Sequence, residues 1–164
     1  MSTEDNKFLL RLDEGKVIQV LQERMIFKVM SADTNGLYTL FVNSAEPGGG
    51  SPPHIHHQED EAFFILEGNY EFLLGEKTLE LGPGSFLFAP RGIPHASKNV
   101  GTTRSRMVVI VSPAGLENCF VEMGQPVTDT SAPATPSGPP DIEQLIAITQ
   151  KYGVELLQPP EHAG

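Results

Sequence analysis

The chain has 164 residues, a length typical of one domain, and carries 11 basic against 21 acidic side chains, giving a formal net charge of −10. This charge argues against nucleic acid and anionic membrane surfaces as partners, because both repel a net anion. Cys119 is the single cysteine, which excludes an internal disulfide and fits a reducing compartment. The N-terminus lacks the basic and apolar regions of a signal peptide, and no apolar run reaches the length of a membrane span, so we expect a cytoplasmic protein without a membrane partner.

In chain order, residues 1–23 are mixed and charged, and we expect an extension that packs on or beside the domain. From residue 24 to 113, short apolar runs alternate with turn signals such as Asp33-Thr34-Asn35-Gly36 and Gly82-Pro83-Gly84. The predicted strands are Met25–Met30, Leu37–Ala45, Glu61–Leu66, Tyr70–Leu74, Thr78–Leu81, Ser85–Ala89 and Met107–Val111. Short strands at this spacing predict an all-β sandwich or closed barrel.

The period changes after Pro113. Leu116, Cys119, Phe120 and Met123 form the apolar stripe of a short helix within 114–124, and Cys119 is interpreted as a packing residue. Residues 125–140 are rich in proline and predict a loose linker or an extended arm. Within 141–164, Asp141 is the expected N-cap of a second helix that ends near Gly153, and the remainder is a tail.

The histidines give the first indication of a site. His54 and His56 are two residues apart, so on a strand both imidazoles point to the same face. Glu61 begins the next predicted strand and can return a carboxylate to that point, and His95 follows one or two hairpins later. Three imidazoles and a carboxylate suit one divalent transition metal ion (Fe, Mn, Ni, Co, Cu or Zn) rather than Ca²⁺ or Mg²⁺, which prefer oxygen ligands. Four protein ligands leave a coordination position open for chemistry.

Two spacings in this region match family motifs. The first runs from Gly48 through His54, His56 and Glu61 to Gly68, and the second from Gly84 through Pro90, Gly92 and His95 to Asn99. Both resemble the motifs of the cupin superfamily. The resemblance implies a double-stranded β-helix, or jelly-roll barrel, with a metal bound inside by His54, His56, Glu61 and His95. The segments after the barrel, Pro113–Glu117 and Tyr152-Gly153-Val154-Glu155, resemble those of quercetin-dioxygenase-like single-domain cupins.

The neighbours of these residues have plainer interpretations. The alternative to a metal site is a set of barrel histidines hydrogen-bonded to one another or to water. His57 must point to the opposite face from the ligands, and His162 lies in a polar tail. Glu59 and Asp60 fit a solvated turn, although either could hydrogen-bond a ligand imidazole.

A substrate pocket is predicted beside the site. Phe63 and Ile65 share the parity of Glu61, and Phe86 and Phe88 precede the second motif, so these four could line an apolar pocket above the metal; the alternative is core packing. Arg104 and Arg106 could pair an anionic substrate, but surface charges are the simpler interpretation. Gly48-Gly49-Gly50 resembles a phosphate-binding loop only superficially, because no helix N-terminus or Lys-Ser/Thr pair follows it. It is interpreted as a flexible turn.

These observations lead to one main functional hypothesis and two alternatives. The main one is an oxygen-dependent dioxygenase acting on an enolic or phenolic small molecule, in which Glu61 serves as ligand and as proton acceptor. The alternatives are a metal-dependent isomerase or lyase, and a non-catalytic domain that binds a small ligand. Short edge strands and a spare apolar helix also predict a homodimer.

Overall fold

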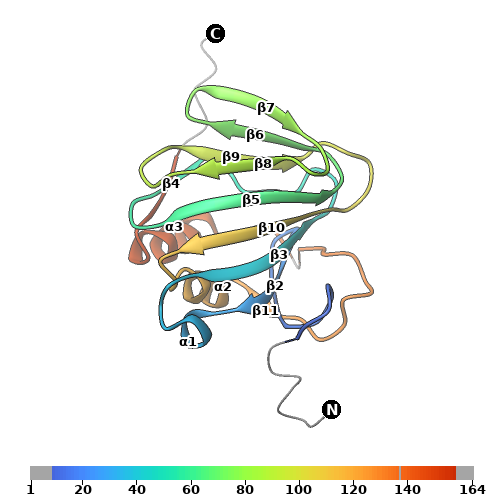
Figure 1. Cartoon of the computed structure of the whole chain (residues 1–164), viewed down its shortest axis with the longest axis horizontal. Helices are drawn as coiled ribbons and strands as arrows, with labels where there is room; N and C mark the ends of the chain where they lie inside the picture. Colours follow the sequence, from blue (N-terminus) through green and yellow to red (C-terminus); the bar gives the residue numbers. More distant parts are fainter. Residues whose placement is uncertain (1–8, 137, 158–164) are drawn as a thin grey trace.

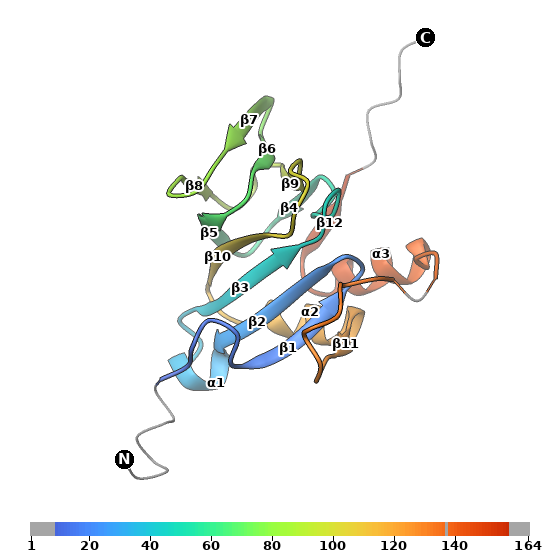
Figure 2. The ribbon, with the colours of Figure 1, turned by 90° about the vertical axis from the view of Figure 1, so that its right-hand side faces the viewer.

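The computed structural model describes residues 9–136 and 138–157, and within them two antiparallel sheets face each other (Figures 1 and 2). The seven-stranded sheet has, in order, β11 (Gln125–Pro126), β1 (Lys16–Val20), β2 (Glu23–Val29), β3 (Thr39–Ala45), β10 (Ser105–Ser112), β5 (Asp60–Glu67) and β8 (Phe86–Ala89). The five-stranded sheet has, in order, β12 (Val154–Leu156), β4 (His54–His56), β9 (His95–Asn99), β6 (Tyr70–Leu74) and β7 (Lys77–Leu81). This is a jelly-roll β-sandwich, which confirms the all-β prediction.

Side-chain alternation builds the core between the sheets. On β5, Glu61, Phe63 and Ile65 point inward and are at most 6% exposed, whereas Phe64 on the other face is 44% exposed. Phe63 packs edge-to-face on Phe72 of β6, with the ring centroids 5.2 Å apart, so the two sheets meet directly below the site.

Three helices complete the described part of the fold: α1 (Ser31–Thr34), α2 (Glu117–Met123) and α3 (Ile142–Lys151). In Figure 2, α2 and α3 lie together on one side of the sandwich. Leu116 and Cys119 of the first predicted stripe join the core there, together with Ile148 of α3. On the second helix, Ile142 and Ile146 are instead 56% and 37% exposed. Asp141 caps α3, because its carboxylate accepts a hydrogen bond from the Gln144 amide at 3.0 Å, as predicted. No helix among the described residues is long and apolar enough to cross a membrane.

The seven-stranded sheet starts earlier than the predicted boundary at residue 24. Lys16–Val20 forms β1, pairing with β2 along its whole length, because Val17 and Ile18 are both buried. Of the N-terminal extension, residues 1–8 lie outside the described residues. Within residues 1–23, which we expected to pack on or beside the domain, residues 16–20 are therefore a strand of the sheet itself.

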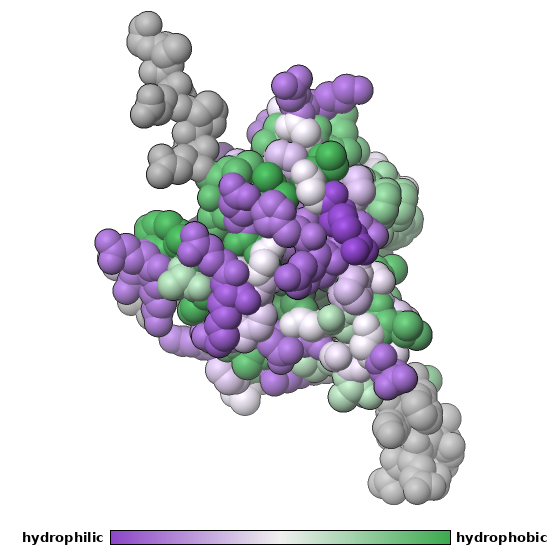
Figure 3. All heavy atoms as spheres, turned by 90° about the vertical axis from the view of Figure 1, so that its left-hand side faces the viewer, coloured by the Kyte–Doolittle hydropathy of each residue, from purple (hydrophilic) through white to green (hydrophobic). Residues whose placement is uncertain are grey.

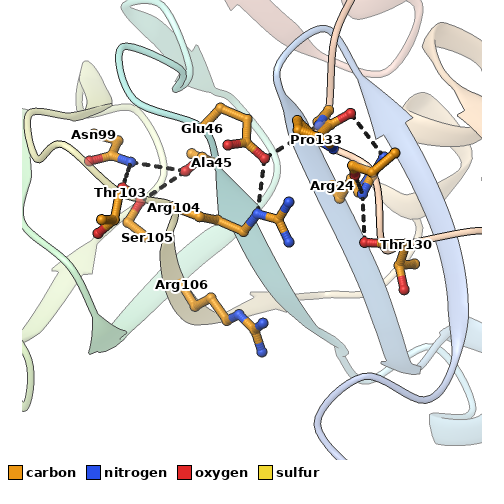
Figure 4. Close-up of polar contacts among 12 residues, drawn as sticks. Arg24, Ala45, Glu46, Asn99, Thr103, Arg104, Ser105, Arg106, Thr130 and Pro133 are labelled. Atoms are coloured by element: carbon orange, nitrogen blue, oxygen red, sulfur yellow. Dashed lines mark hydrogen bonds and ion pairs between the residues drawn. The ribbon is translucent and has the colours of Figure 1, made fainter.

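The proline-rich segment is fastened to the sheet as an arm. Gln125–Pro126 pairs with β1 as β11, and Ala134 is 3% exposed. Figure 4 shows Arg24 of β2 reaching the arm, where its guanidinium donates to the carbonyls of Thr130 (3.1 Å), Ala132 (2.6 Å) and Pro133 (3.4 Å). Of the two predicted forms, the structure has the extended arm.

The surface is mixed in polarity. In the space-filling view of Figure 3, hydrophilic residues cover much of the face, with hydrophobic residues scattered between and around them. Arg104 and Arg106 are paired with carboxylates: Arg104 Nε lies 2.9 Å from Glu46, and Arg106 lies 3.1 Å from Asp13 and 2.9 Å from Glu67. Neither is among the residues that line the cavity described below, in agreement with the surface interpretation.

Candidate metal centre

Three strands from both sheets bring the four predicted ligands together. His54 and His56 lie on β4, and His95 lies on β9, where it pairs directly with His54. Glu61 comes from β5 in the opposite sheet, between Ala89 and Val111. All four residues are 9% exposed or less, so the cluster is enclosed between the sheets.

The loop before β4 is hydrogen-bonded to β9 and so helps to fix the position of His54. Residues 48–51 lie along β9 and are joined to it by backbone hydrogen bonds, including Gly48 N to Asn99 O (2.9 Å) and Asn99 N to Gly49 O (2.8 Å). Gly50 has φ +154°, and a side chain there would collide with the Ser97 carbonyl. The glycines thus allow a close approach between loop and strand, and the interpretation as a flexible turn is corrected.

The candidate ligand atoms converge on one point. His54 Nε2 and His56 Nε2 are 3.1 Å apart, and Glu61 Oε2 lies 3.1 Å from His56 Nε2 and 2.7 Å from His95 Nε2. One ligand atom from each of the four residues lies within 4.8 Å of all the others. Two ligand atoms bound to one ion at about 2.0–2.2 Å are at most about 4.4 Å apart. The 2.7–3.1 Å separations lie within that limit.

Hydrogen bonds behind the rings decide what the imidazoles present to this point. His54 Nδ1 lies 2.7 Å from the Pro52 carbonyl, and His95 Nδ1 lies 3.2 Å from the Ile93 carbonyl. A carbonyl only accepts, so each Nδ1 carries a proton, and each Nε2 faces the cluster and has a lone pair when its ring is neutral. Nε2 of His54 and of His95 and the Glu61 carboxylate therefore face one another, an arrangement that could hold a cation at its centre. The chemistry of the donor set fits a divalent transition metal.

The protonation states follow from burial and from Glu61. Burial, reinforced by the two neighbouring imidazoles, lowers the pKa of His54 to about 4. Burial opposes the charge on His56 as well, but Glu61 and Glu59 outweigh it and raise the pKa of His56 to about 9. Burial would raise the pKa of Glu61, yet His56 and His95 hold it well below its ordinary value. The cluster thus holds an ionised carboxylate at every pH near neutrality.

Glu59 differs from its neighbour Asp60. It is 6% exposed, and its Oε2 faces His56 Nδ1 at 3.6 Å, which places it behind a candidate ligand rather than in a solvated turn. Asp60 instead pairs with Arg91 at 3.1 Å. His57 points away from the cluster, as expected, and its Nε2 lies 2.8 Å from Glu155 of β12. His162 lies outside the described residues.

An apolar cavity of about 150 Å³ opens onto His54, His56 and Glu61. Phe63 lines it, as predicted, and contacts His95 edge-to-face with the ring centroids 5.9 Å apart. The other apolar lining residues that sequence reasoning did not single out for the pocket include Met25, Phe41, Met107, Val109, Leu116, Phe120 and Met123. They come from β2, β3, β10 and the α2 region, whose inward faces only the sheet register identifies.

The other three predicted pocket residues lie elsewhere. Ile65 is 1% exposed and belongs to the core rather than to the cavity lining. Phe86 and Phe88 are 64% and 50% exposed, because the register pairs Glu61 with Ala89 and Phe63 with Leu87. Leu87 and Ala89 therefore point inward, and the pocket prediction for Phe86 and Phe88 is corrected.

Comparisons with known proteins agree with this geometry. The family model for the cupin domain matches residues 42–111. Germin-like protein subfamily 2 member 2 of Arabidopsis thaliana is 30% identical over 166 residues, which cover 94% of this chain and 71% of that protein. The chain belongs to the cupin superfamily.

Two further similarities concern fold and partial sequence. Quercetin 2,3-dioxygenase of Bacillus subtilis is 27% identical to this cupin over 128 residues, 77% of the chain and 37% of that protein. The cupin thus spans little more than a third of that relative's length. A predicted oxalate decarboxylase from Thermotoga maritima has the same fold, with a TM-score of 0.60 at 20% identity over 64% of this chain and 98% of that one.

Proposed function

We propose that His54, His56, Glu61 and His95 bind one divalent transition metal ion, and that the protein is a dioxygenase acting on a small enolic or phenolic compound. The observation that supports this most is the convergence of lone-pair nitrogens and a carboxylate on one point at the end of an apolar cavity. The similarity to quercetin 2,3-dioxygenase supports the reaction class.

The residues of the chain have separate roles in this proposal. A bound ion would supply open coordination positions and the electron transfer that oxygen chemistry needs. Glu61 accepts the proton of the substrate hydroxyl at a carboxylate oxygen, because it is ionised and buried beside the cavity. Phe63 and the other apolar side chains exclude water and hold the ring against Glu61. A dioxygenase places both atoms of O₂ in its product and so needs no external reductant.

The first test measures metal content. We expect His56→Ala to lower the metal content of the purified protein, measured by elemental analysis, by about tenfold or more, since a ligand is lost from an enclosed site. His57→Ala is the matched control, because His57 is adjacent in sequence but bonded to Glu155 on the other face, and should keep the full content. Equal metal content in both variants would contradict the ligand assignment.

The second test measures oxygen uptake. Protein loaded separately with Fe, Mn, Ni or Co is given single-ring catechols, β-diketones and a flavonol, and we expect uptake with at least one substrate and metal. Glu61→Gln should abolish the uptake, because its amide cannot accept the proton. Absence of uptake across the panel overturns the dioxygenase proposal. Conversion of a substrate without oxygen would favour the isomerase or lyase, and thermal stabilisation without conversion the ligand-binding domain.

A further inference from the structure

The cavity has a second polar group away from the four-residue cluster. Glu23 of β2 and Asn43 of β3 both line it, and they are 8% and 4% exposed. Asn43 Nδ2 donates to Glu23 Oε1 at 2.8 Å, so the two side chains act as one unit. Neither residue was singled out from the sequence, where a Glu two residues before Met25 reads as an ordinary strand end.

This pair has an unused hydrogen-bonding group. Asn43 Oδ1 is buried and has no hydrogen-bond partner within the described part of the chain. Burying a carboxyl and an amide oxygen among apolar side chains costs stability, unless a bound molecule completes their hydrogen bonds. Burial also raises the pKa of Glu23 to about 7, against the hydrogen bond from Asn43, which lowers it. The pair is therefore a polar group that the fold itself leaves incomplete.

Sheet register places Asn43 at a different level of the cavity from Glu61. Glu61 pairs with Val111, which pairs with Thr39 at the start of β3. Asn43 lies four residues further along β3, which corresponds to about 13 Å at the rise of an antiparallel strand. A cavity of about 150 Å³ holds a molecule of the size of benzene. One ring with a polar substituent at each end matches this volume and can contact both levels.

We propose that Glu23 and Asn43 form a hydroxyl-binding subsite that recognises the far end of a single-ring substrate, whose near end lies against Glu61 and the histidines. This inference rests on the proposed function and adds the substrate's second polar group. The hydroxyl donates to Asn43 Oδ1 and lies within reach of the Glu23 carboxyl. A substrate with a methyl group in its place leaves the amide oxygen unpaired in an apolar site, and sites of this kind discriminate strongly against such analogues.

The test compares two ligands that differ by one hydroxyl group, 4-(hydroxymethyl)catechol and 4-methylcatechol. Binding is measured by titration calorimetry on the full chain loaded with Zn²⁺, which has no redox step and so allows no turnover. We expect the hydroxymethyl compound to bind about fivefold tighter or more, the range of one added hydrogen bond.

Two variants and a control make the result specific. Asn43→Leu removes the acceptor and should reduce the preference to less than about twofold. At pH 8, where the Glu23 carboxyl is ionised and cannot donate, Glu23→Gln should do the same without loss of folding. Its new amide can donate to Asn43 Oδ1 while accepting from Asn43 Nδ2, which uses up the acceptor. Met107→Leu lines the same cavity without a polar atom and should keep the preference, even if both affinities change.

The outcomes separate this inference from the proposed function. If both ligands bind in wild type and not in His56→Ala, but with equal affinity or with a preference that survives in Asn43→Leu and Glu23→Gln, the subsite is overturned and the proposed function stands. If neither ligand binds, the phenolic substrate class fails and the subsite fails with it. A preference that is lost in both variants and kept in Met107→Leu supports the subsite.

Discussion

At the scale of single residues, three buried carboxyl groups of one sandwich differ in protonation state. Glu61 lies among imidazoles and is held ionised, whereas Glu23 lies among apolar side chains and an amide and keeps its proton to near neutral pH. Glu117, 2% exposed, is ionised because it accepts hydrogen bonds from Thr39, Ser31 and Gly115, each at 2.7 Å. Burial alone therefore does not fix the charge of a carboxyl group; its hydrogen-bond donors do.

Glu23 should make stability depend on pH. Its pKa is about 7 in the folded protein against an ordinary value of 4.5, so the folded state keeps a proton that the unfolded chain releases. The contribution of this group to the free energy of unfolding is fully present below pH 4.5. It is lost as the pH rises through 7, and the loss amounts to about 3 kcal/mol at most. Urea denaturation at pH 5 and pH 8 should show this loss in wild type and a smaller one in Glu23→Gln. Identical changes in both proteins would exclude it.

Glu117 should show the opposite dependence. Burial raises its pKa, but the three hydrogen bonds hold it below its ordinary value, so its contribution to stability is present above pH 4.5 and is lost on acidification. We expect Glu117→Gln to lower the free energy of unfolding at pH 7 by about 1–3 kcal/mol, with a smaller deficit in acid. Glu71→Gln on the exposed face of β6 is the control, with a change within about 0.5 kcal/mol. A deficit at pH 7 no larger than that of the control would contradict the assignment.

At the scale of elements, one guanidinium makes three of the hydrogen bonds that fasten the arm over 125–136. Arg24 is 5% exposed and satisfies three carbonyls of a segment that is otherwise poor in regular structure (Figure 4). Its planar fork makes these contacts together, which an ammonium group at the same position does not. Glu46 and Gln19 also bond the arm, at the Ala134 amide (3.3 Å) and the Thr135 carbonyl (3.0 Å). Side-chain contacts therefore hold the arm more than its β-pairing, which covers only Gln125 and Pro126.

We expect Arg24→Lys to loosen this arm. We expect a low dose of proteinase K to cleave within residues 127–136 several-fold faster than in wild type, as followed by mass spectrometry. The reason is that local opening of the arm costs less free energy. Arg11→Ala is the comparison, since Arg11 pairs with Glu14 on the exposed surface. Unchanged cleavage in Arg24→Lys would show that other contacts hold the arm.

At the scale of the whole molecule, the strand with two candidate ligands is held from both sides. His54 pairs with His95 on β9, and all three residues of β4 pair with β12, in the order Val154 with His56, Glu155 with Ile55 and Leu156 with His54. Without β12, β4 would be an edge strand of three residues with one ladder pair. The far C-terminal strand is therefore part of the support of the candidate metal centre.

Truncation tests this support. A chain ending at Gly153 should lose about tenfold or more of its bound metal by elemental analysis, because residues that orient ligands affect metal affinity on this scale. A chain ending at Leu157 keeps β12 and should retain the metal. Equal metal content in the two truncated chains would assign no role to β12.

The sequence predicts the candidate site better than the surroundings of the site. The four candidate ligands follow from local spacing, since i and i+2 on a strand share a face and the cupin motifs fix the rest. The all-β fold and the family follow from the same motifs and are confirmed. The homodimer predicted from edge strands stays a prediction.

The residues that line the pocket could not be predicted from local spacing, because the lining depends on pairing between strands that are distant in sequence. The run Phe86-Leu87-Phe88-Ala89 is apolar on both faces, so only the register with β5 decides that Leu87 and Ala89 point inward. Glu23 and Asn43 face each other across β2 and β3, twenty residues apart in sequence, with no local pattern to link them. The strand β12 has its partner about a hundred residues earlier, as the His57–Glu155 contact at a separation of 98 shows.

This separation has a consequence for the order of folding. The central hairpins, such as β6 with β7, close over a few residues and can form early, whereas β12 must close a loop of nearly a hundred residues before β4 gains its second neighbour. During synthesis, His54 and His56 leave the ribosome long before Val154–Leu156. The growing chain therefore exposes its histidines without the strand that aligns them, and the candidate metal centre is complete only after most of the sandwich has folded.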